Sequence, residues 1–111
     1  MAEYKMVVLS NPVPGREQEC DQWYEDVHLK DMVKFTGFKS AQRFRLQSPI
    51  AESNPYQFLA IYEIETDDLD STVQELITAA ETGNLNVSES LNTETAYAVI
   101  YGSCGEVVYS T

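Results

Sequence analysis

Three short stretches of this 111-residue chain are apolar at most positions, and they constrain its fold more than any other feature. They are residues 4–9 (YKMVVL), 56–64 (YQFLAIYEI) and 97–101 (YAVIY). Runs of this length, rich in β-branched and aromatic residues, are typical of β-strands. Because a strand turns alternate residues to opposite faces, these strands are apolar on both faces of a sheet. Both faces of that sheet must therefore be covered.

Two helices are predicted between these strands. Apolar residues recur at three- and four-residue spacing from Arg16 to about Lys34, which predicts an amphipathic helix that ends before Gly37. The same spacing recurs over residues 69–80, preceded by a Thr-Asp-Asp sequence that offers N-cap residues. Gly83 is the natural end of this second helix.

One further strand and the loops complete the pattern. Residues 39–46 (KSAQRFRL) alternate in character and predict a strand. Residues 47–55 and 84–94 are polar and predict loops, and residues 106–109 predict a short terminal strand.

The predicted order is strand, helix, strand, strand, helix, strand. This is the ferredoxin-like βαββαβ arrangement, an α+β fold in which both helices cover one face of a four-stranded antiparallel sheet. The second face of such a sheet is usually polar, whereas here it is apolar. A second copy of the same sheet is its simplest cover, so we expect a homodimer through the sheet face. The length suits one domain over residues 1–111.

The charge balance excludes several classes of partner. The chain has 18 acidic and 7 basic residues and a formal net charge of −11. Nucleic acids and anionic membranes bind cationic surfaces, so neither is expected as a partner. No apolar run reaches membrane-spanning length, no signal-peptide pattern is visible, and two cysteines are too few for a disulfide framework. These features favour a cytoplasmic protein.

Residues 23–32 (WYEDVHLKDM) hold the only tryptophan and the only histidine. On a helix, Tyr24, His28 and Asp31 share one face because they are four and three residues apart. One interpretation is a proton-transfer site, with His28 as acid or base and Tyr24 beside it. The other is the polar edge of a core helix. The helix end and Asp31 favour a protonated imidazole and burial opposes it, so we expect a pKa near neutrality.

Further residues are candidate ligand contacts. Arg43 would pair with a ligand carboxylate or phenolate, or with Asp31, if its side chain points into a cleft; otherwise it belongs to the dimer contact. Trp23, Phe44 and Tyr62 are candidates for apolar lining, although aromatic residues of this kind more often belong to the core, and Trp23 fits a helix-on-sheet contact. One histidine and two distant cysteines do not suggest a metal site, and no glycine-rich phosphate loop is present. We expect no metal and no cofactor.

Two segments resemble a known group. The pattern W-Y-x-x-V-H at residues 23–28 and the strand G-F-x-S-A-Q-R-F at residues 37–44 resemble the dimeric α+β barrel superfamily, especially its EthD-like members. The resemblance covers about residues 4–101. It implies a homodimer built sheet to sheet, and a small-molecule cleft between sheet and helices with His28 and Tyr24 beside it. Relatives include cyclases, isomerases, monooxygenases, haem-degrading enzymes and members without an assigned activity, so the resemblance does not choose an activity.

Three functions fit these expectations. The first is a cofactor-independent enzyme of the cyclase, isomerase, lyase or monooxygenase type, which uses His28 as acid or base on a small apolar or phenolic compound. The second is a non-catalytic ligand-binding or accessory protein of a catabolic or biosynthetic pathway, with the same cleft. The third is a structural dimer with no ligand, in which the cleft is fully packed.

Overall fold

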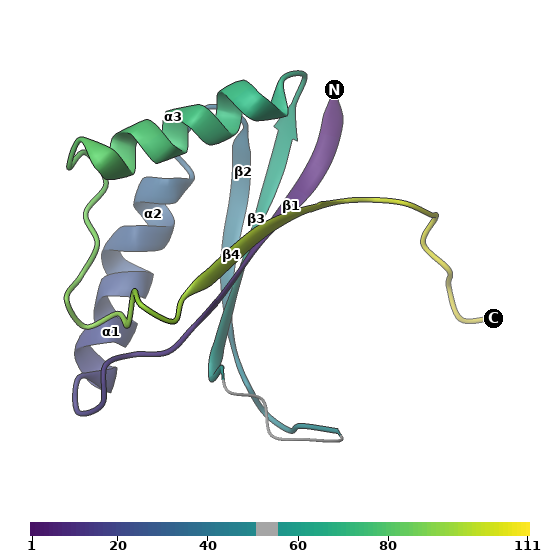
Figure 1. Cartoon of the computed structure of the whole chain (residues 1–111). Coiled ribbons are helices and arrows are strands. Elements are labelled where there is room, and N and C mark those ends of the chain that lie inside the picture. The colour runs from purple at the N-terminus through teal and green to yellow at the C-terminus, as the bar shows by residue number, and fades with distance from the viewer. Residues whose placement is uncertain (51–55) are drawn as a thin grey trace.

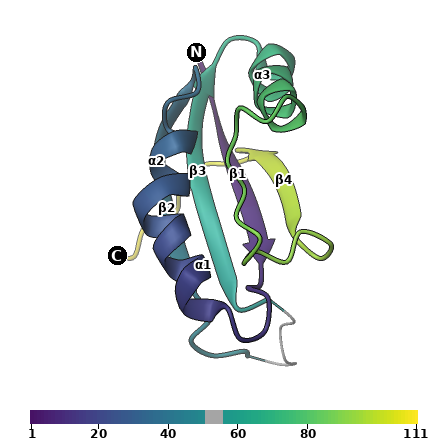
Figure 2. The ribbon, with the colours of Figure 1, turned by 90° about the vertical axis from the view of Figure 1, so that its left-hand side faces the viewer.

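The computed structural model describes residues 1–50 and 56–111, so part of the predicted 47–55 loop lies outside the described residues. A four-stranded antiparallel sheet forms one layer, and the helices cover one of its faces (Figures 1 and 2). The spatial order of the strands is β2-β3-β1-β4. Their bounds are Ala2–Ser10 (β1), Phe38–Arg45 (β2), Phe58–Thr66 (β3) and Tyr97–Gly102 (β4).

The first helical stretch has three parts that follow each other without a break. They are α1 (Glu17–Trp23), a π-helical turn η1 (Tyr24–His28) and α2 (Leu29–Met32). The sequence predicts one uniform helix here, and the π-helical turn is a departure from that prediction. α3 spans Leu69–Glu81, close to its predicted bounds.

Gly37 ends the first helical stretch, as the sequence predicts. It has a φ of +90°, and a Cβ at this position would lie 3.1 Å from the carbonyl oxygen of Glu65. Only glycine adopts this conformation and tolerates this approach without strain. The tight turn brings α2 directly back onto β2 and so fixes the helical stretch against the sheet.

The core lies between the sheet and the first helical stretch. Because side chains alternate along a strand, the even-numbered residues of β1 and β3 point toward the helices. The helices add apolar residues that recur at helical spacing. The buried apolar residues are Met6, Cys20, Trp23, Tyr24, Met32, Phe38, Phe58, Ala60, Tyr62 and Ile64.

The opposite face of the sheet, here called the outer face, is also apolar, as predicted from the two-sided strands. No helix among the described residues covers it (Figure 2). Its charged side chains lie at one end, where Lys5 and Glu63 form an ion pair and Glu3 lies opposite Glu65. Strand register places eight apolar residues on this face: Val7, Leu9, Phe44, Leu59, Ile61, Tyr97, Val99 and Tyr101.

The element order and the antiparallel pairing confirm the predicted ferredoxin-like α+β fold. The predicted strand over residues 106–109 is wrong. The chain leaves the sheet after Gly102, at the end of β4, and residues 103–111 form no strand. Gly102 already pairs with Tyr4, close to the beginning of β1, so residues 106–109 would have no β1 residue left to pair with.

Candidate functional site

The π-helical turn gathers three rings. The imidazole of His28 stacks on the Trp23 indole with ring centroids 4.5 Å apart, and meets the Tyr24 ring edge-on at 5.1 Å. Single π-helical turns inside α-helices are uncommon and occur frequently at functional sites, because the wider turn re-aims the side chains around it. Here the turn holds the imidazole between an indole and a phenol.

Burial controls the charge of this imidazole. His28 is 8% exposed. Burial lowers the pKa of His28 from 6.5 to about 4, while nearby Asp31 opposes the fall. The expected balance near neutrality is therefore wrong, since desolvation outweighs the carboxylate. The Asp31 carboxylate is partly exposed and lies 3.8 Å from the ammonium of Lys34. This positive charge offsets part of the effect of Asp31 on the imidazole. At neutral pH the imidazole is uncharged.

Two buried polar atoms of this cluster lack a hydrogen-bond partner among the described residues. They are Nδ1 of His28 and Nε1 of Trp23. An indole nitrogen can only donate, whereas a ring nitrogen of a neutral imidazole donates or accepts. Leaving such a group unsatisfied costs roughly 1–3 kcal/mol. The stacked pair thus presents unused hydrogen-bonding capacity in an otherwise apolar environment.

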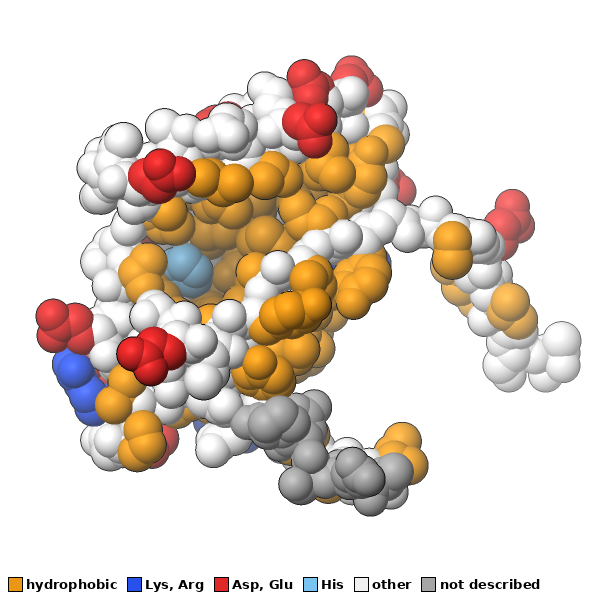
Figure 3. Space-filling view, in the orientation of Figure 1, with side chains coloured by type: hydrophobic (Ala, Val, Ile, Leu, Met, Phe, Trp, Pro, Cys, Tyr) orange, Lys and Arg blue, Asp and Glu red, His pale blue; other side chains and the backbone are white. Residues whose placement is uncertain are grey.

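A hollow leads to this cluster. Figure 3 shows the imidazole, the only pale-blue side chain, at the floor of a hollow whose walls are hydrophobic. A cavity of about 440 Å³ lies elsewhere, on the outer face, whereas one of about 690 Å³ lies between α3 and β4. The larger cavity is lined by residues of α3, β1 and β4 and not by His28 or Trp23. Its lining residues are Met6, Leu69, Asp70, Val73, Gln74, Leu76, Ile77, Ala98, Val99 and Ile100. Ligand pockets commonly have volumes of about 300–1,000 Å³ and apolar walls.

α3 leaves this space open because its apolar stripe is not packed to the sheet. Leu76 contacts the core cluster, but Ile77, one residue further along the stripe, is 43% exposed. An amphipathic helix normally buries such a stripe completely. Part of the stripe is therefore left without a covering side chain among the described residues.

Arg43 lies on the helix-facing side of β2. Its Nη1 donates to Oδ1 of Asp21 at 2.7 Å, and its side chain is 8% exposed. The guanidinium carbon lies 3.9 Å from the centroid of the Phe58 ring and 4.6 Å from that of Tyr24. The carboxylate partner of Arg43 is Asp21, so the suggested pairing with Asp31 is wrong. The side chain also points away from the outer face, which removes it from a dimer contact there.

The two interior phenols stay neutral in this environment. Burial raises the pKa of Tyr24, and the charge of Arg43 partly offsets the rise. Burial also raises the pKa of Tyr62, and the neighbouring Tyr24 adds to the effect. Both phenols are therefore proton donors in hydrogen bonds at neutral pH.

Tyr24 connects most of the predicted site residues, because it contacts His28 on one side and Arg43 on the other. Phe44 is separate from them: it pairs with Leu59 on the outer face and is 40% exposed. No sequence pattern singles out Asp21 as a site residue, although it lies three residues before Tyr24. The residues that meet around Tyr24 are Trp23, His28, Arg43 and Tyr62.

Within residues 1–50 and 56–111, no group of three or more histidine, cysteine, aspartate or glutamate side chains is arranged to hold a metal ion. In the same part of the chain, no helix is both long and apolar enough to span a membrane.

No protein-family model and no curated protein sequence matches the chain. Solved structures do match. One, of an EthD family protein from Bacillus halodurans C-125, is 12% identical with a TM-score of 0.64, over 91% of this chain and 98% of that one. The chain shares the fold of an EthD family protein.

Two further structures match over nearly their whole length. The protein At3g17210 from Arabidopsis thaliana is 15% identical with a TM-score of 0.70, over 95% of this chain and 99% of that one. A proposed monooxygenase from Shewanella loihica PV-4 is 19% identical with a TM-score of 0.57, over 98% and 97%. At these identities the match establishes the fold, and it confirms the resemblance predicted from the sequence at that level.

Proposed function

We propose that this chain binds a small, mostly apolar molecule in the hollow at His28, and that the bound molecule carries an oxygen that reaches Trp23 and His28. The unpartnered Nδ1 of His28 and Nε1 of Trp23 carry this proposal. A carbonyl or phenolic oxygen between the two rings would accept from the indole and bond the imidazole. The apolar lining between α3 and β4 would hold the rest of the molecule.

We further propose that the chain is an enzyme that needs only proton transfer, with His28 as the group that moves the proton. The neutral imidazole begins as a proton acceptor, from a phenol or from a carbon next to a carbonyl. The ligand anion that forms would lie beside the new imidazolium and stabilise it. This negative charge would raise the low pKa of His28 once the proton has been transferred. Asp31 acts in the same direction. Tyr24 would orient the ligand as a neutral donor, with Arg43 behind it.

The comparisons support this proposal through the fold alone. A proposed monooxygenase and an EthD family protein share the fold, but a fold hosts many activities. A non-catalytic binding or accessory protein would use the same hollow and the same two unpartnered atoms. The two functions differ in one observable: an enzyme converts its ligand and loses turnover without His28, whereas a binding protein releases the ligand unchanged.

Binding is tested with 1-naphthol as a phenolic probe and naphthalene as its matched control. The chain has one tryptophan, so the indole N–H gives one resonance in a two-dimensional NMR spectrum. We expect 1-naphthol to shift this resonance saturably, and naphthalene to shift it much less, because naphthalene lacks the oxygen. Substituting Leu76→Phe, which adds bulk to the cavity wall and no second indole, should weaken both effects. Equal shifts for the two probes would contradict the hydrogen-bonding role of the stacked pair.

Catalysis is tested by incubating the protein with phenols and aromatic ketones of one to three rings and following their masses and their exchange of carbon-bound hydrogen for deuterium. We expect exchange or conversion with at least one of them, lost in His28→Phe and retained in Lys30→Gln, a change at an exposed position two residues further along the chain. Saturable binding with no conversion by the wild type would favour the non-catalytic function.

We also propose that two protomers pack through their outer faces. Contiguous apolar patches of this kind mark interaction sites, and this face holds eight apolar residues, with the charged residues Glu3, Lys5, Glu63 and Glu65 gathered at one end. An Ile61→Asp substitution puts a charge in the middle of the face and should give a monomer in sedimentation, while Thr78→Asp on α3 should not. A wild-type protein that sediments as a monomer at all concentrations would contradict the dimer.

A further inference from the structure

The C-terminal arm, residues 103–111, leaves the body of the protein after β4. Three of its residues are large apolar side chains in contact with little of the protomer: Val107 is 72% exposed, Val108 92% and Tyr109 80%. Consecutive apolar residues in a solvated segment are unusual, because apolar surface in contact with water is unfavourable in free energy. Burial of the side chains removes this unfavourable contact. Within the protomer nothing described covers them.

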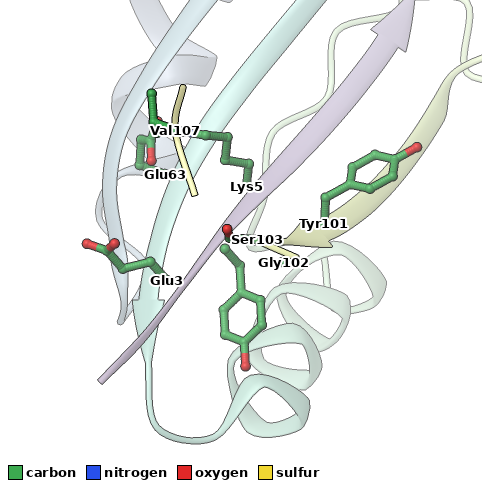
Figure 4. Close-up of a pocket in the computed structure, with 8 residues that line it drawn as sticks. Glu3, Lys5, Glu63, Tyr101, Gly102, Ser103 and Val107 are labelled. Carbon is green, nitrogen blue, oxygen red and sulfur yellow. The ribbon is translucent and has the colours of Figure 1, made fainter. Parts of the chain in front are cut away.

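The arm lies on the side of the sheet that carries the outer face. Figure 1 shows it curving away from the end of β4, on the side opposite the helices, and Figure 2 shows it behind the sheet when the helices are in front. A cavity of about 440 Å³ separates the base of the arm from the sheet. Figure 4 shows its walls, with Lys5, Glu63 and Tyr101 from the outer face and Val107 from the arm. Sheet and arm thus border one open space.

We infer that a second copy of this chain fills this space and that the C-terminal arm of each protomer embraces the other, burying Val107, Val108 and Tyr109 against the partner copy. The inference rests on the proposed dimer and goes beyond it: sheet-to-sheet packing alone assigns no role to the arm. Under a two-fold axis the exchange is reciprocal, so both arms are buried at once.

The dimensions of the arm permit this exchange. Nine extended residues reach at most about 30 Å. Packed sheets lie about 10 Å apart, so the arm is long enough to pass the facing sheet and contact the partner beyond it. A segment that folded back on its own outer face would instead compete with the partner copy for the same apolar surface.

The make-up of the face favours a second copy over other occupants. The register places its charged residues at one end, where Glu3 lies opposite Glu65 and Lys5 forms an ion pair with Glu63. A nucleic acid would meet carboxylates there and no cationic surface. A basic protein would find acidic groups at that end alone, whereas a second copy matches the larger, apolar part of the face.

The test compares the full-length wild type with Val107→Asp and Val108→Asp by sedimentation at a series of concentrations. Thr93→Asp, an exposed loop position away from the arm, is the charge-matched control. We expect the dimer dissociation constant to rise at least tenfold in the arm variants and to stay unchanged in the control. Circular dichroism should show the same fold in all of them, since the arm residues are exposed in the protomer.

A second measurement uses the exposed Cys104 within the arm, since the other cysteine, Cys20, is buried. A benzophenone attached to Cys104 and mixed with an affinity-tagged copy should cross-link the two chains on irradiation. The same label on the Ile61→Asp variant, with its outer face disrupted, should give no such product.

The outcomes separate the two proposals. A wild type that dimerises with the same affinity as both arm variants, or that cross-links only within one chain, overturns the arm exchange and leaves the sheet-to-sheet dimer standing. A wild type that is monomeric throughout overturns both.

Discussion

The uncharged imidazole of His28 makes the stability of the protein depend on pH in a defined window. The folded protein holds the pKa of His28 at about 4, whereas the unfolded chain restores it to about 6.5. Between these values the unfolded state binds the proton and the folded state does not. Because protons favour the state that binds them, the free energy of unfolding falls as the pH drops from about 6.5 toward 4.

The magnitude follows from the size of the shift. The full difference of about 2.5 pKa units corresponds to about 3 kcal/mol. About 1.4 kcal/mol of it is lost by about pH 5.5, and little is lost above about pH 7. With 92% of the residue surface removed from solvent, screening by water is small. Protonation at this one buried residue therefore lowers the free energy of unfolding by about as much as a typical destabilising mutation does.

Urea denaturation of the protein without added ligand, repeated between about pH 7.5 and 4.5, measures this loss when wild type and His28→Gln are compared. Carboxylates that titrate in the same range contribute to both proteins and cancel in the difference. The single histidine also gives one imidazole Hε1 resonance, whose NMR titration should have a midpoint near 4. Asp31→Asn should move that midpoint lower, because Asp31 raises the pKa. A midpoint at the ordinary value, or a flat difference in stability, would refute the reasoning.

Three further changes test the packing by urea denaturation at neutral pH. Asp21→Asn removes the carboxylate from the buried guanidinium of Arg43 and should cost about 1–3 kcal/mol, whereas unchanged stability would contradict the pairing. Gly37→Ala should cost more than about 1 kcal/mol, since its Cβ would press on the carbonyl of Glu65; a stabilised variant would contradict this turn geometry. Asp68→Ala removes the N-cap of α3 and should cost about 1 kcal/mol, against no loss in Asp68→Asn.

The direction of Arg43 illustrates what the sequence could not supply. Strand periodicity correctly separates Arg43 from Phe44 onto opposite faces, but β2 has no purely polar side to mark which face is inside. A register shift between Phe38 and Ser40 then changes which positions face the helices. Such a bulge shifts every later side chain by one step, and only the pairing of β2 with β3 reveals it. In the structure, the face of β2 that carries Arg43 is the one that points toward the helices.

The π-helical turn and the pKa of His28 were beyond the sequence for a related reason. Spacing correctly places Tyr24 and His28 on one side of the helical stretch. The change in hydrogen-bonding pattern over Tyr24–His28, however, is a response to packing rather than to any residue type. The sequence identified both burial and Asp31 as influences on the imidazole, but their relative strength depends on how closely Trp23 and the other neighbours enclose it.

The sequence by itself determined the element order, the two apolar faces of the sheet and the grouping of Trp23, Tyr24 and His28, because these follow from periodicities of two and of three to four residues along the chain. Only the tertiary structure decided that Arg43 points inward to Asp21, that the imidazole is uncharged, and that α3 leaves a cavity above the sheet. Each of these properties depends on contacts between residues that are far apart in the chain. The spacing of residues within one segment does not predict such contacts.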